Sequence, residues 1–246
     1  MIPLRHARRV ALSTFLASLI VLGCSLTVFA ADLFKGNEAI PSDAIVIFDG
    51  KDLSQWVRNG TDQTPKWIIK DGYMQVRGGS IQTKQEFSSY QLHVEFWLPL
   101  MADMKGQDRA NSGIFMNDAY EVQVLDSYGI EPEAHRCGAI YSITAPTVNA
   151  SRPPEQWQSF DMLFYAPKFD DKGSKTANAR ISMMQNGVWI HNDVEIPNPT
   201  ACHKCPEKAT GHIIVQDHGN PIRYRNIWIR PLAADYVTLA QPTAGK

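Results

Sequence analysis

Residues 90–98 read Tyr-Gln-Leu-His-Val-Glu-Phe-Trp-Leu, and this stretch decides the fold class. Leu92, Val94 and Phe96 alternate with residues that are polar or amphipathic. Because successive side chains of a β-strand point to opposite faces, a period of two predicts a strand with one buried face. We therefore expect the stretch to lie in a sheet that covers a hydrophobic core on one side only.

The same kind of pattern recurs along most of the chain. Strand-like runs occupy residues 66–69, 73–76, 112–116, 120–125, 137–143, 160–165, 179–185, 188–190, 212–215 and 226–229. Asp71-Gly72 and Asn186-Gly187 each separate two such runs, and these dipeptides tolerate the positive φ angles of tight hairpin turns. No segment keeps an apolar period of 3.6, so helices are expected to be short and peripheral. The sequence thus predicts one all-β domain over residues 44–232, built as a two-sheet antiparallel β-sandwich.

The first 30 residues have the composition of an export signal. Residues 1–9 carry three arginines and no acid, and residues 10–30 are almost wholly apolar. The segment ends in Val28-Phe29-Ala30, with small residues at the positions that a signal peptidase reads. We therefore expect cleavage after Ala30 and a periplasmic or extracellular protein. Residues 31–43 and 233–246 are interpreted as a loose leader and tail.

Two alternatives for the N-terminal segment stay open. Val21-Leu22-Gly23-Cys24 resembles a lipoprotein signal, in which Cys24 would carry a lipid anchor and hold the protein on a membrane. A Leu usually stands at the place of Val21, and more apolar sequence follows the cysteine, so ordinary cleavage is preferred. The other alternative is a retained membrane helix. The lack of a basic flank after the apolar run argues against it, so no transmembrane segment is expected in the mature chain.

The charge balance argues against one class of partner. The chain has 246 residues, with 24 Lys+Arg against 25 Asp+Glu and a net charge of −1. Loss of residues 1–30, with their three arginines and no acid, would leave 216 residues and a net charge of −4. No run of Lys or Arg follows that could serve as a footprint for a phosphate backbone, so nucleic acid is not expected as a partner. The balance fits an uncharged ligand such as a small carbohydrate.

Several short motifs occur in a recognisable order. They are Phe48–Trp56 (FDGKDLSQW), Asn111–Phe115 (NSGIF), Tyr120–Asp126 (YEVQVLD), Gly138–Tyr141 (GAIY), Gln216–Pro221 (QDHGNP) and Arg223–Trp228 (RYRNIW). Together they resemble the 3-keto-disaccharide hydrolase family over nearly all of the chain that follows the export segment. Members of that family resemble concanavalin A-like lectins and glucanases in fold, so the resemblance implies a jelly-roll sandwich.

The resemblance implies a reaction that ordinary glycosidases do not use. In a sugar oxidised at C3, the proton on C2 lies beside a carbonyl group, so a protein base can remove it while the glycosidic oxygen leaves from C1. Water then adds to the unsaturated sugar, and the net reaction is hydrolysis of a 3-keto-glycoside or 3-keto-disaccharide. Such a site needs a base of matched pKa, a group that stabilises the enolate oxygen and a proton donor for the leaving group. Carboxylates and histidines can fill these roles, and a divalent cation is a further candidate.

Glu121 and Gln123 are the first candidates for the site, because they share one face of the strand expected at residues 120–125. Glu121-Val-Gln123-Val-Leu-Asp126 also has the spacing of the catalytic motif of laminarinase-like glycosidases, which carries three acids. Here Gln123 replaces the middle acid. A retaining glycosidase needs two carboxylates about 5 Å apart, so the pattern argues against a standard glucanase. We interpret Glu121 as a catalytic or metal-binding carboxylate, Gln123 as a hydrogen-bonding partner of the sugar and Asp126 as structural.

His218 is the preferred base and, beside Glu121, the other candidate metal ligand. It stands in Gln216-Asp217-His218-Gly219, after an apolar strand and before Pro221, where a loop can present it at the rim of a site. Asp217 is expected to orient His218 or the adjacent chain. The alternative is a turn in which Asp217 and Gly219 only satisfy the backbone.

Five further residues are interpreted as substrate-binding. Glu95 and Trp97 lie on the outer face of the strand at 90–98, where an aromatic ring can stack on a sugar; plain solvation is the alternative. Arg223 and Arg225 share a face by alternation and could bind an enolate or sugar hydroxyls, and a salt bridge to a neighbouring strand is the alternative. Asn111 opens the Asn-Ser-Gly turn that the resemblance places beside the binding cleft, with an ordinary capped turn as the alternative.

Two classes of function remain open. One is an enzyme, a hydrolase or lyase acting on 3-keto-glycosides, and the other is a noncatalytic carbohydrate-binding module on the same sandwich. Geometry can separate them. An enzyme is expected to bring four side chains together in one cleft: Glu95, Glu121, Gln123 and His218. Scattering of these side chains over separate faces would favour the binding module.

The cysteines suggest no further chemistry. Cys202-His203-Lys204-Cys205 is a single C-x-x-C motif without a second pair, and a local disulfide is the preferred interpretation in an exported protein. The redox state of Cys202 and Cys205 stays open. Cys137 begins an apolar run and is interpreted as a buried thiol rather than a nucleophile.

Overall fold

The structure is a computed structural model that describes residues 40–200 and 206–232. Within these residues it consists of antiparallel strands joined by loops, with one short 3₁₀ helix, η1 (Gly106–Asp108). No helix in the described part of the chain has the length and apolar character needed to cross a membrane.

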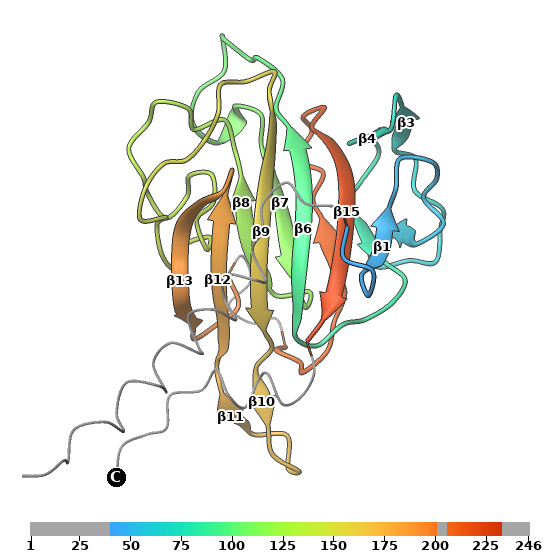
Figure 1. The fold of residues 1–246 in the computed structure, drawn as a ribbon, viewed down its shortest axis with the longest axis vertical. Helices are drawn as coiled ribbons and strands as arrows, with labels where there is room; N and C mark the ends of the chain where they lie inside the picture. Colours follow the sequence, from blue (N-terminus) through green and yellow to red (C-terminus); the bar gives the residue numbers. More distant parts are fainter. Residues whose placement is uncertain (1–39, 201–205, 233–246) are drawn as a thin grey trace, which may run out of the picture. The chain divides into compact units, whose positions relative to one another are not determined.

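The larger sheet contains eight strands. They are β1 (Ile45–Phe48), β3 (Ile68–Lys70), β4 (Tyr73–Gln75), β6 (Tyr90–Trp97), β9 (Trp157–Tyr165), β12 (Ala179–Gln185), β13 (Val188–Ile196) and β15 (Arg223–Pro231). Their order is β13-β12-β9-β6-β15-β4-β3, and β1 also pairs with β15. This sheet faces the viewer in Figure 1.

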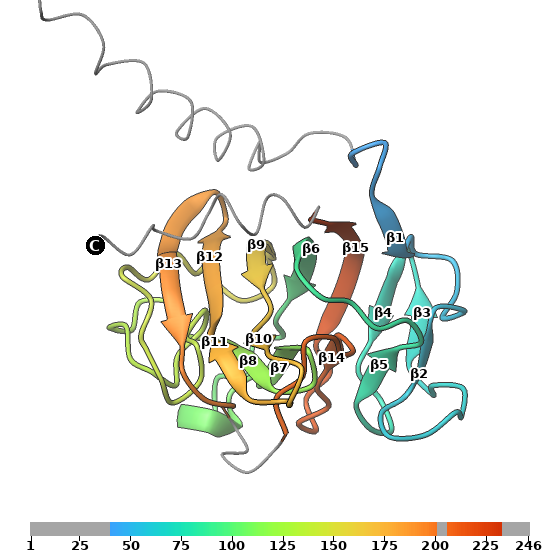
Figure 2. The same cartoon turned by 90° about the horizontal axis from the view of Figure 1, so that it is seen from below.

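The second sheet contains five strands. They are β2 (Trp56–Arg58), β5 (Ile81–Thr83), β7 (Ser112–Met116), β8 (Tyr120–Val124) and β14 (Ile214–Val215), in the order β2-β5-β14-β7-β8. A separate two-stranded ribbon, β10 (Lys168–Phe169) and β11 (Lys175–Ala177), extends beyond the ends of β9 and β12 (Figure 1). Figure 2 shows the two larger sheets as stacked layers.

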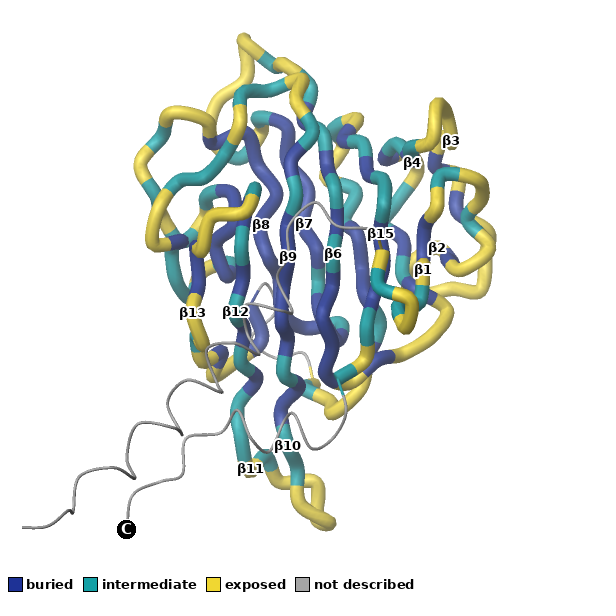
Figure 3. Tube along the Cα trace, viewed as in Figure 1, coloured by how far each residue is buried: buried dark blue, intermediate teal, exposed yellow. Residues whose placement is uncertain are grey.

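The hydrophobic core fills the space between the layers. Its largest fully buried side chains include Trp56, Tyr90, Phe96, Tyr120, Phe160, Phe164 and Tyr224. Figure 3 shows buried residues concentrated along the central strands, with exposed residues in the connecting loops. The protein is therefore an all-β, two-sheet antiparallel sandwich of the jelly-roll type, in agreement with the sequence-based expectation.

Strand β6, which contains most of the alternating stretch at residues 90–98, lies in the middle of the larger sheet. Leu92, Val94 and Phe96 of β6 are at most 1% exposed and belong to the core, whereas the residues between them are partly exposed on the outer face. Both predicted hairpins are confirmed. Asp71-Gly72 connects β3 to β4 and Asn186-Gly187 connects β12 to β13, and all four residues have φ between 49° and 79°.

One predicted strand is wrong, and several short ones were not predicted. Residues 137–143 form isolated bridges instead of a strand, because Gly138 and Ser142 have positive φ and Ile140 pairs with both Val122 and Thr144 as the chain turns back. Five strands lacked a prediction: β1, β2, β5, β10 and β11. They have two to four residues each, too few for a period of two to stand out.

Candidate active site

A cavity of about 210 Å³ opens on the outer face of the five-stranded sheet. Seven residues from β8, η1 and the surrounding loops line it: Gln107, Asn111, Glu121, Gln123, Tyr141, Gln216 and His218. Four of them, Asn111, Glu121, Gln123 and His218, are residues that the sequence analysis singled out. The structure therefore brings together parts of the chain that are up to 111 positions apart, from Gln107 to His218.

Alternation along β8 directs Glu121 and Gln123 into the cavity. Tyr120, Val122 and Val124 point the other way and are part of the core. On the neighbouring strand β7, Gly113 pairs with Gln123. A Cβ atom at Gly113 would overlap the Glu121 carboxylate, so the absence of a side chain there gives that carboxylate its place.

A loop that pairs with the edge strand β8 forms another side of the cavity. The Gln123 backbone N–H donates to the Ala139 carbonyl at 3.0 Å, and the Tyr141 N–H donates to the Glu121 carbonyl, also at 3.0 Å. This pairing brings the Tyr141 ring beside the cavity. The segment predicted as a strand at 137–143 thus contributes to the site as an irregular loop.

Glu121 is buried but makes no side-chain hydrogen bond. Only 3% of the residue is exposed, and its carboxylate has no hydrogen-bond partner among the described residues. Burial without a compensating partner disfavours the charged form and raises the pKa of Glu121 to about 7. It is the only Asp or Glu among the seven lining residues, so the cavity has one acid of unusual proton affinity.

A group of side-chain amides forms the wall next to Glu121, with Gln107 at its centre. Gln123 Nε2 donates to Gln107 Oε1 at 2.9 Å and to Asn111 Oδ1 at 3.3 Å. Asn111 Nδ2 donates to the Gln107 carbonyl at 2.7 Å, and Gln107 Nε2 donates to the carbonyl of His135 at 2.8 Å. Gln123 Oε1 remains without a partner and can accept a hydrogen bond from a sugar hydroxyl.

The loop after β14 carries His218 to the opposite wall. The Gln216 N–H donates to the Gly113 carbonyl at 2.9 Å, and Ser112 Oγ donates to the Gln216 carbonyl at 2.6 Å, so β7 fixes the start of this loop. His218 itself is exposed, and its ring has no hydrogen-bond partner among the described residues. It lines the cavity as a rim residue, the position expected from its place after an apolar strand.

The carboxylates of Asp217 and Asp126 bind neighbouring groups of the fold and do not face the cavity. The Asp217 carboxylate accepts hydrogen bonds from the N–H groups of Gly79 at 2.7 Å and Gly219 at 2.8 Å, and no hydrogen bond joins it to His218. This is the turn geometry given above as the alternative. Asp126 forms an ion pair with Arg109 at 2.7 Å and is 2% exposed. Neither carboxylate lines the cavity.

Three residues of the cavity were missed by sequence reasoning. Gln107 lies in the three-residue helix η1, Tyr141 lies in the irregular loop and Gln216 precedes the turn at His218. Tyr141 and Gln216 belong to the motifs Gly138–Tyr141 and Gln216–Pro221, so that signal was present but not used. Nothing in the sequence around Gln107 marks it as a site residue.

The other predicted site residues lie on the other sheet. Glu95 and Trp97 of β6 and Arg223 and Arg225 of β15 occupy the outer face of the eight-stranded sheet, away from the cavity. Of the four side chains that an enzyme was expected to bring together in one cleft, Glu121, Gln123 and His218 line the cavity and Glu95 does not.

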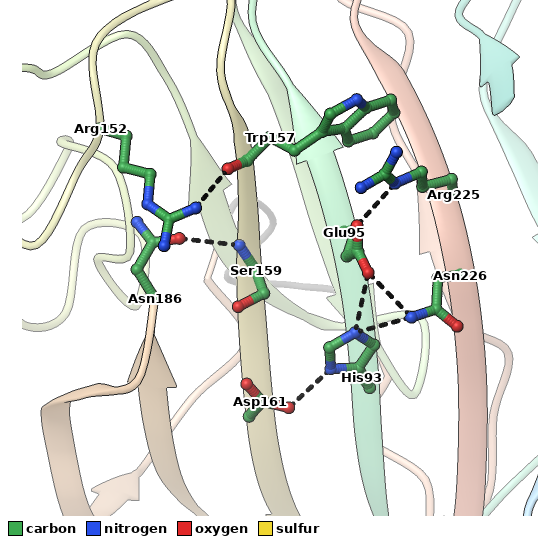
Figure 4. Close-up of polar contacts among 9 residues, drawn as sticks. All are labelled: His93, Glu95, Arg152, Trp157, Ser159, Asp161, Asn186, Arg225 and Asn226. Atoms are coloured by element: carbon green, nitrogen blue, oxygen red, sulfur yellow. Dashed lines mark hydrogen bonds and ion pairs between the residues drawn. The ribbon is translucent and has the colours of Figure 1, made fainter. Parts of the chain in front are cut away.

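Glu95 belongs to a cluster of charged and polar residues, shown in Figure 4 and called here the polar cluster: His93, Glu95, Asp161, Arg225 and Asn226. Glu95 accepts hydrogen bonds from Arg225 Nε at 2.6 Å and Asn226 Nδ2 at 2.8 Å. His93 Nδ1 lies 2.6 Å from Asp161 Oδ1, and its ring stacks on Trp228 at 5.3 Å between centroids. Arg225 therefore forms a salt bridge to a neighbouring strand, which was the alternative to substrate binding given in the sequence analysis.

Both ionisable groups at the centre of the polar cluster are held in their charged forms. Burial raises the pKa of Glu95, but hydrogen bonds from His93, Asn226 and Arg225 outweigh it and bring the value to about 2. Burial likewise opposes protonation of His93, whereas its bonds to Asp161 and Glu95 raise the pKa to about 9. At neutral pH the cluster consists of paired charges.

A catalytic zinc ion fits the cavity poorly. The lining residues include one carboxylate and one imidazole, fewer than the three protein ligands of a typical catalytic zinc site. Within residues 40–200 and 206–232 no group of three or more His, Cys, Asp or Glu side chains could hold a metal ion.

Cys137, the one cysteine among the described residues, does not line the cavity. Cys137 is a free, buried thiol whose pKa burial raises to about 11, which is the inert state expected from the sequence. Cys202 and Cys205 lie outside the described residues, as do the predicted export segment with Cys24, residues 31–39 of the predicted leader and the predicted tail.

Comparison with known proteins places this geometry in a family. A solved structure of a Parabacteroides distasonis protein, named there as a candidate glycosyl hydrolase, has a TM-score of 0.72 and 37% sequence identity, covering 82% of this chain and 96% of that one. A second protein of that organism with the same kind of name shares the fold at a TM-score of 0.61 and 15% identity, covering 79% of this chain and 99% of that one.

A curated relative carries an activity in its name. It is the 3-keto-disaccharide hydrolase of Bacteroides thetaiotaomicron, 24% identical, with 78% of this chain and 81% of the relative covered. The family model described as the 3-keto-alpha-glucoside-1,2-lyase-like domain matches residues 43–230, which include every residue that lines the cavity. On these grounds the chain belongs to the 3-keto-alpha-glucoside-1,2-lyase-like family of carbohydrate-active proteins.

Proposed function

We propose that the cavity cleaves 3-keto-glycosides by elimination followed by hydration, with Glu121 as the base. The observation that carries the proposal is a single buried carboxylate that faces the cavity, lacks a hydrogen-bond partner and has a pKa of about 7. A general base is most effective when its pKa lies near the working pH, because it is then ionised and still basic. The sequence favoured His218 for this role, but Glu121 is the group whose surroundings raise its basicity.

Each step uses a group that the structure places at the cavity. Glu121 removes the proton from C2 of the sugar, and the electron pair of that C–H bond forms an enolate with the carbonyl group at C3. The enolate then restores the C3 carbonyl and forms the C1–C2 double bond as the C1–O bond breaks, and the leaving oxygen takes a proton from His218. Water later adds its hydroxyl to C1 and a proton returns to C2, which completes the hydrolysis with all atoms accounted for.

Two side chains are suited to hold the 3-keto sugar during these steps. The Tyr141 hydroxyl has no hydrogen-bond partner among the described residues and can donate to the oxygen at C3 as negative charge develops there. Gln123 Oε1 can accept from a ring hydroxyl, and the amide group around Gln107 fixes its orientation. Because the Gln107 side chain joins Gln123 to Asn111, all three amides are held before the substrate arrives.

Direct displacement at C1 is less well supported. Glycosidases of that type use a pair of carboxylates that flank the scissile bond. The residues that line the cavity include one carboxylate, and Asp126, the next acid along the chain, is ion-paired with Arg109. An adjacent carbonyl on the substrate removes the need for the second acid, because it acidifies the C2 proton.

The test is incubation with 3-ketotrehalose, 3-ketosucrose and a simple 3-keto-β-glucoside in D₂O, followed by NMR, with and without a chelator. Elimination and re-addition should place deuterium at C2 of the released 3-keto sugar, and the unoxidised parent sugars should remain intact. Cleavage without deuterium at C2 would argue for displacement at C1. Turnover of none of the three, together with measurable glycan binding, would favour a carbohydrate-binding module.

We propose export of the protein on the basis of residues 1–30 alone, with an arginine-containing start and an apolar stretch ending at Ala30. The mature protein is then periplasmic or extracellular. Intact-mass measurement of the exported chain should give a protein that begins at residue 31. A lipid-modified Cys24 at the N-terminus would replace this assignment with a membrane-anchored lipoprotein.

A further inference from the structure

A row of aromatic and arginine side chains crosses four strands on the outer face of the eight-stranded sheet. Trp157 of β9 pairs with Trp97 of β6, and Trp97 pairs with Arg223 of β15, which in turn pairs with Gln75 of β4. Adjacent strands lie about 4.8 Å apart, so the row extends over about 14 Å. Its members are partly exposed. The row is therefore an open platform rather than part of the core.

Two guanidinium groups lie over the rings of this platform. The Arg223 guanidinium carbon lies 3.9 Å from the centroid of Trp97 and 4.8 Å from that of Tyr73, and that of Arg225 lies 4.0 Å from Trp157. Figure 4 shows Arg225 between the Trp157 ring and Glu95. Cation–π contacts of this kind, together with the hydrogen bond that each Nε makes, restrain both guanidinium groups before any ligand binds.

The hydrogen bonds of both arginines leave the ends of their guanidinium groups free. Arg225 uses Nε for Glu95, and Arg223 uses Nε for Gln75 Oε1 at 3.3 Å. Neither Nη1 nor Nη2 of either residue has a hydrogen-bond partner within the described part of the chain. Arg223 and Arg225 are two positions apart on one strand face, so their Cα atoms lie about 7 Å from each other.

The charges near the row do not cancel. Arg225 is paired with Glu95, but Arg223 makes no ion pair with a described residue. Arg152, whose Nη1 donates to the Trp157 carbonyl at 2.9 Å, is exposed and has no acidic partner either. Two positive charges are thus uncompensated at this end of the face, on a chain whose net charge is −1.

We propose that this platform binds an acidic saccharide, with an oxyanion on the free ends of Arg223 and Arg225 and the sugar against the exposed parts of Trp97 and Trp157. The fork of a guanidinium group matches the two oxygens of a carboxylate or of a sulfate ester. One face of each indole ring is covered by an arginine, and the part that stays exposed provides apolar area for the C–H surface of a sugar. The platform lies on the sheet opposite the cavity and does not depend on the proposed reaction.

Binding of three tetrasaccharides to the full chain tests the proposal: tetragalacturonate, a sulfated galactan tetrasaccharide and neutral maltotetraose. We expect an acidic tetrasaccharide to quench tryptophan fluorescence and to bind at least about tenfold more tightly than maltotetraose, since hydrogen bonds to charged groups are the stronger ones. The ratio between the two acidic probes identifies the preferred oxyanion. Equal affinity for maltotetraose, or no binding of either acidic probe, would overturn the proposal.

Matched variants locate the site. Arg223→Gln should lower the affinity for the acidic probe at least about tenfold, and Arg223→Lys, which keeps the charge but removes the fork, should lower it nearly as much. Arg58→Gln is the control, because Arg58 is exposed on β2 and makes no ion pair with a described residue. Equal losses in Arg223→Gln and Arg58→Gln, with both folds intact by circular dichroism, would mean diffuse charge attraction and overturn the site. Glu121→Gln should bind as the unmodified chain does, which separates this result from any failure of the proposed reaction.

Discussion

The cavity and the polar cluster occupy the outer faces of opposite sheets, and each has a glutamate at its centre. Glu95 has three polar partners and a pKa lowered to about 2, whereas Glu121 has none and a pKa raised to about 7. Both lie in strands that alternate apolar and polar residues. The comparison shows that reactivity is marked by what surrounds a carboxylate, because a fully paired acid is stable in its charged form and has little affinity for a proton.

The largest difference between the two glutamates should be in turnover. Glu121→Gln is expected to lower cleavage of a 3-keto-glycoside by about 10³-fold, within the range for loss of a general base, and Glu95→Gln should leave it within about threefold. NMR of product formation measures both. Equal effects of the two substitutions would break the distinction drawn between the two faces.

Gly113→Ala should affect the cavity next most strongly. The added Cβ would overlap the Glu121 carboxylate and displace it, so turnover should fall by about 10²-fold without loss of the fold. Gly72→Ala is the control, since Gly72 lies at a φ of 78° in the β3–β4 hairpin with open space around it. That control should lower stability slightly and leave turnover unchanged. Unchanged turnover in Gly113→Ala would show that the mechanism does not require the Glu121 carboxylate to lie against Gly113.

The polar cluster should respond in stability instead. His93→Gln leaves Asp161 and Glu95 without the cation between them, and we expect a loss of about 2–3 kcal/mol in the free energy of unfolding at pH 7. His135→Gln, at an exposed loop position, should change it by less than about 0.5 kcal/mol. Chemical denaturation measures both. A neutral His93→Gln would show that the cluster does not hold its three strands together.

The two pKa shifts predict opposite dependences on pH. Because Glu121 must be ionised to act as a base, kcat/KM should fall about tenfold per pH unit below pH 7. Its raised pKa means that the folded state binds the proton more tightly than the unfolded state, so this residue lowers stability as pH rises from about 4.5 to 7. Glu121→Gln should therefore raise stability at pH 8 by up to about 3 kcal/mol and have little effect at pH 4.

The lowered pKa of Glu95 has the reverse sign. Its contribution to stability is present above about pH 4.5 and is lost as pH falls toward 2, whereas that of His93 is present below about pH 6.5 and is lost as pH rises through 9. Thermal unfolding of Glu95→Gln and Glu121→Gln between pH 2 and 8 compares the two sheets directly. Parallel pH profiles for these two variants would contradict the assigned shifts.

Runs rich in apolar and β-branched residues could be predicted as strands, and five short strands outside such runs could not. β7 and β12 have the predicted bounds, whereas β9, β13 and β15 extend beyond the predicted runs. Residues 137–143 carry enough apolar side chains to suggest a strand, but positive φ angles at Gly138 and Ser142 depend on contacts with β8. Such strain is set by tertiary packing and leaves no periodic signal.

The residues of the cavity likewise divide into those that a local sequence pattern predicted and those that it did not. Glu121, Gln123, Asn111 and His218 could be predicted, since the first two share a strand face and all four stand in motifs of the family. Glu95 and Trp97 have the same local pattern as Glu121 and Gln123, and no local rule tells which sheet each strand will join. Gln107 had no local signal, because its role arises from contacts with the side chains of Asn111 and Gln123.

The sequence by itself determined that this protein is an all-β sandwich with outward-facing polar residues at known strand positions, because alternation with a period of two is a local property of the chain. Only the tertiary structure decided which of those residues share a cavity. Strand order and loop placement leave the Glu121 carboxylate buried without a hydrogen-bond partner, and they place two cations and an amide beside Glu95. The pKa of a carboxyl group depends on those neighbours.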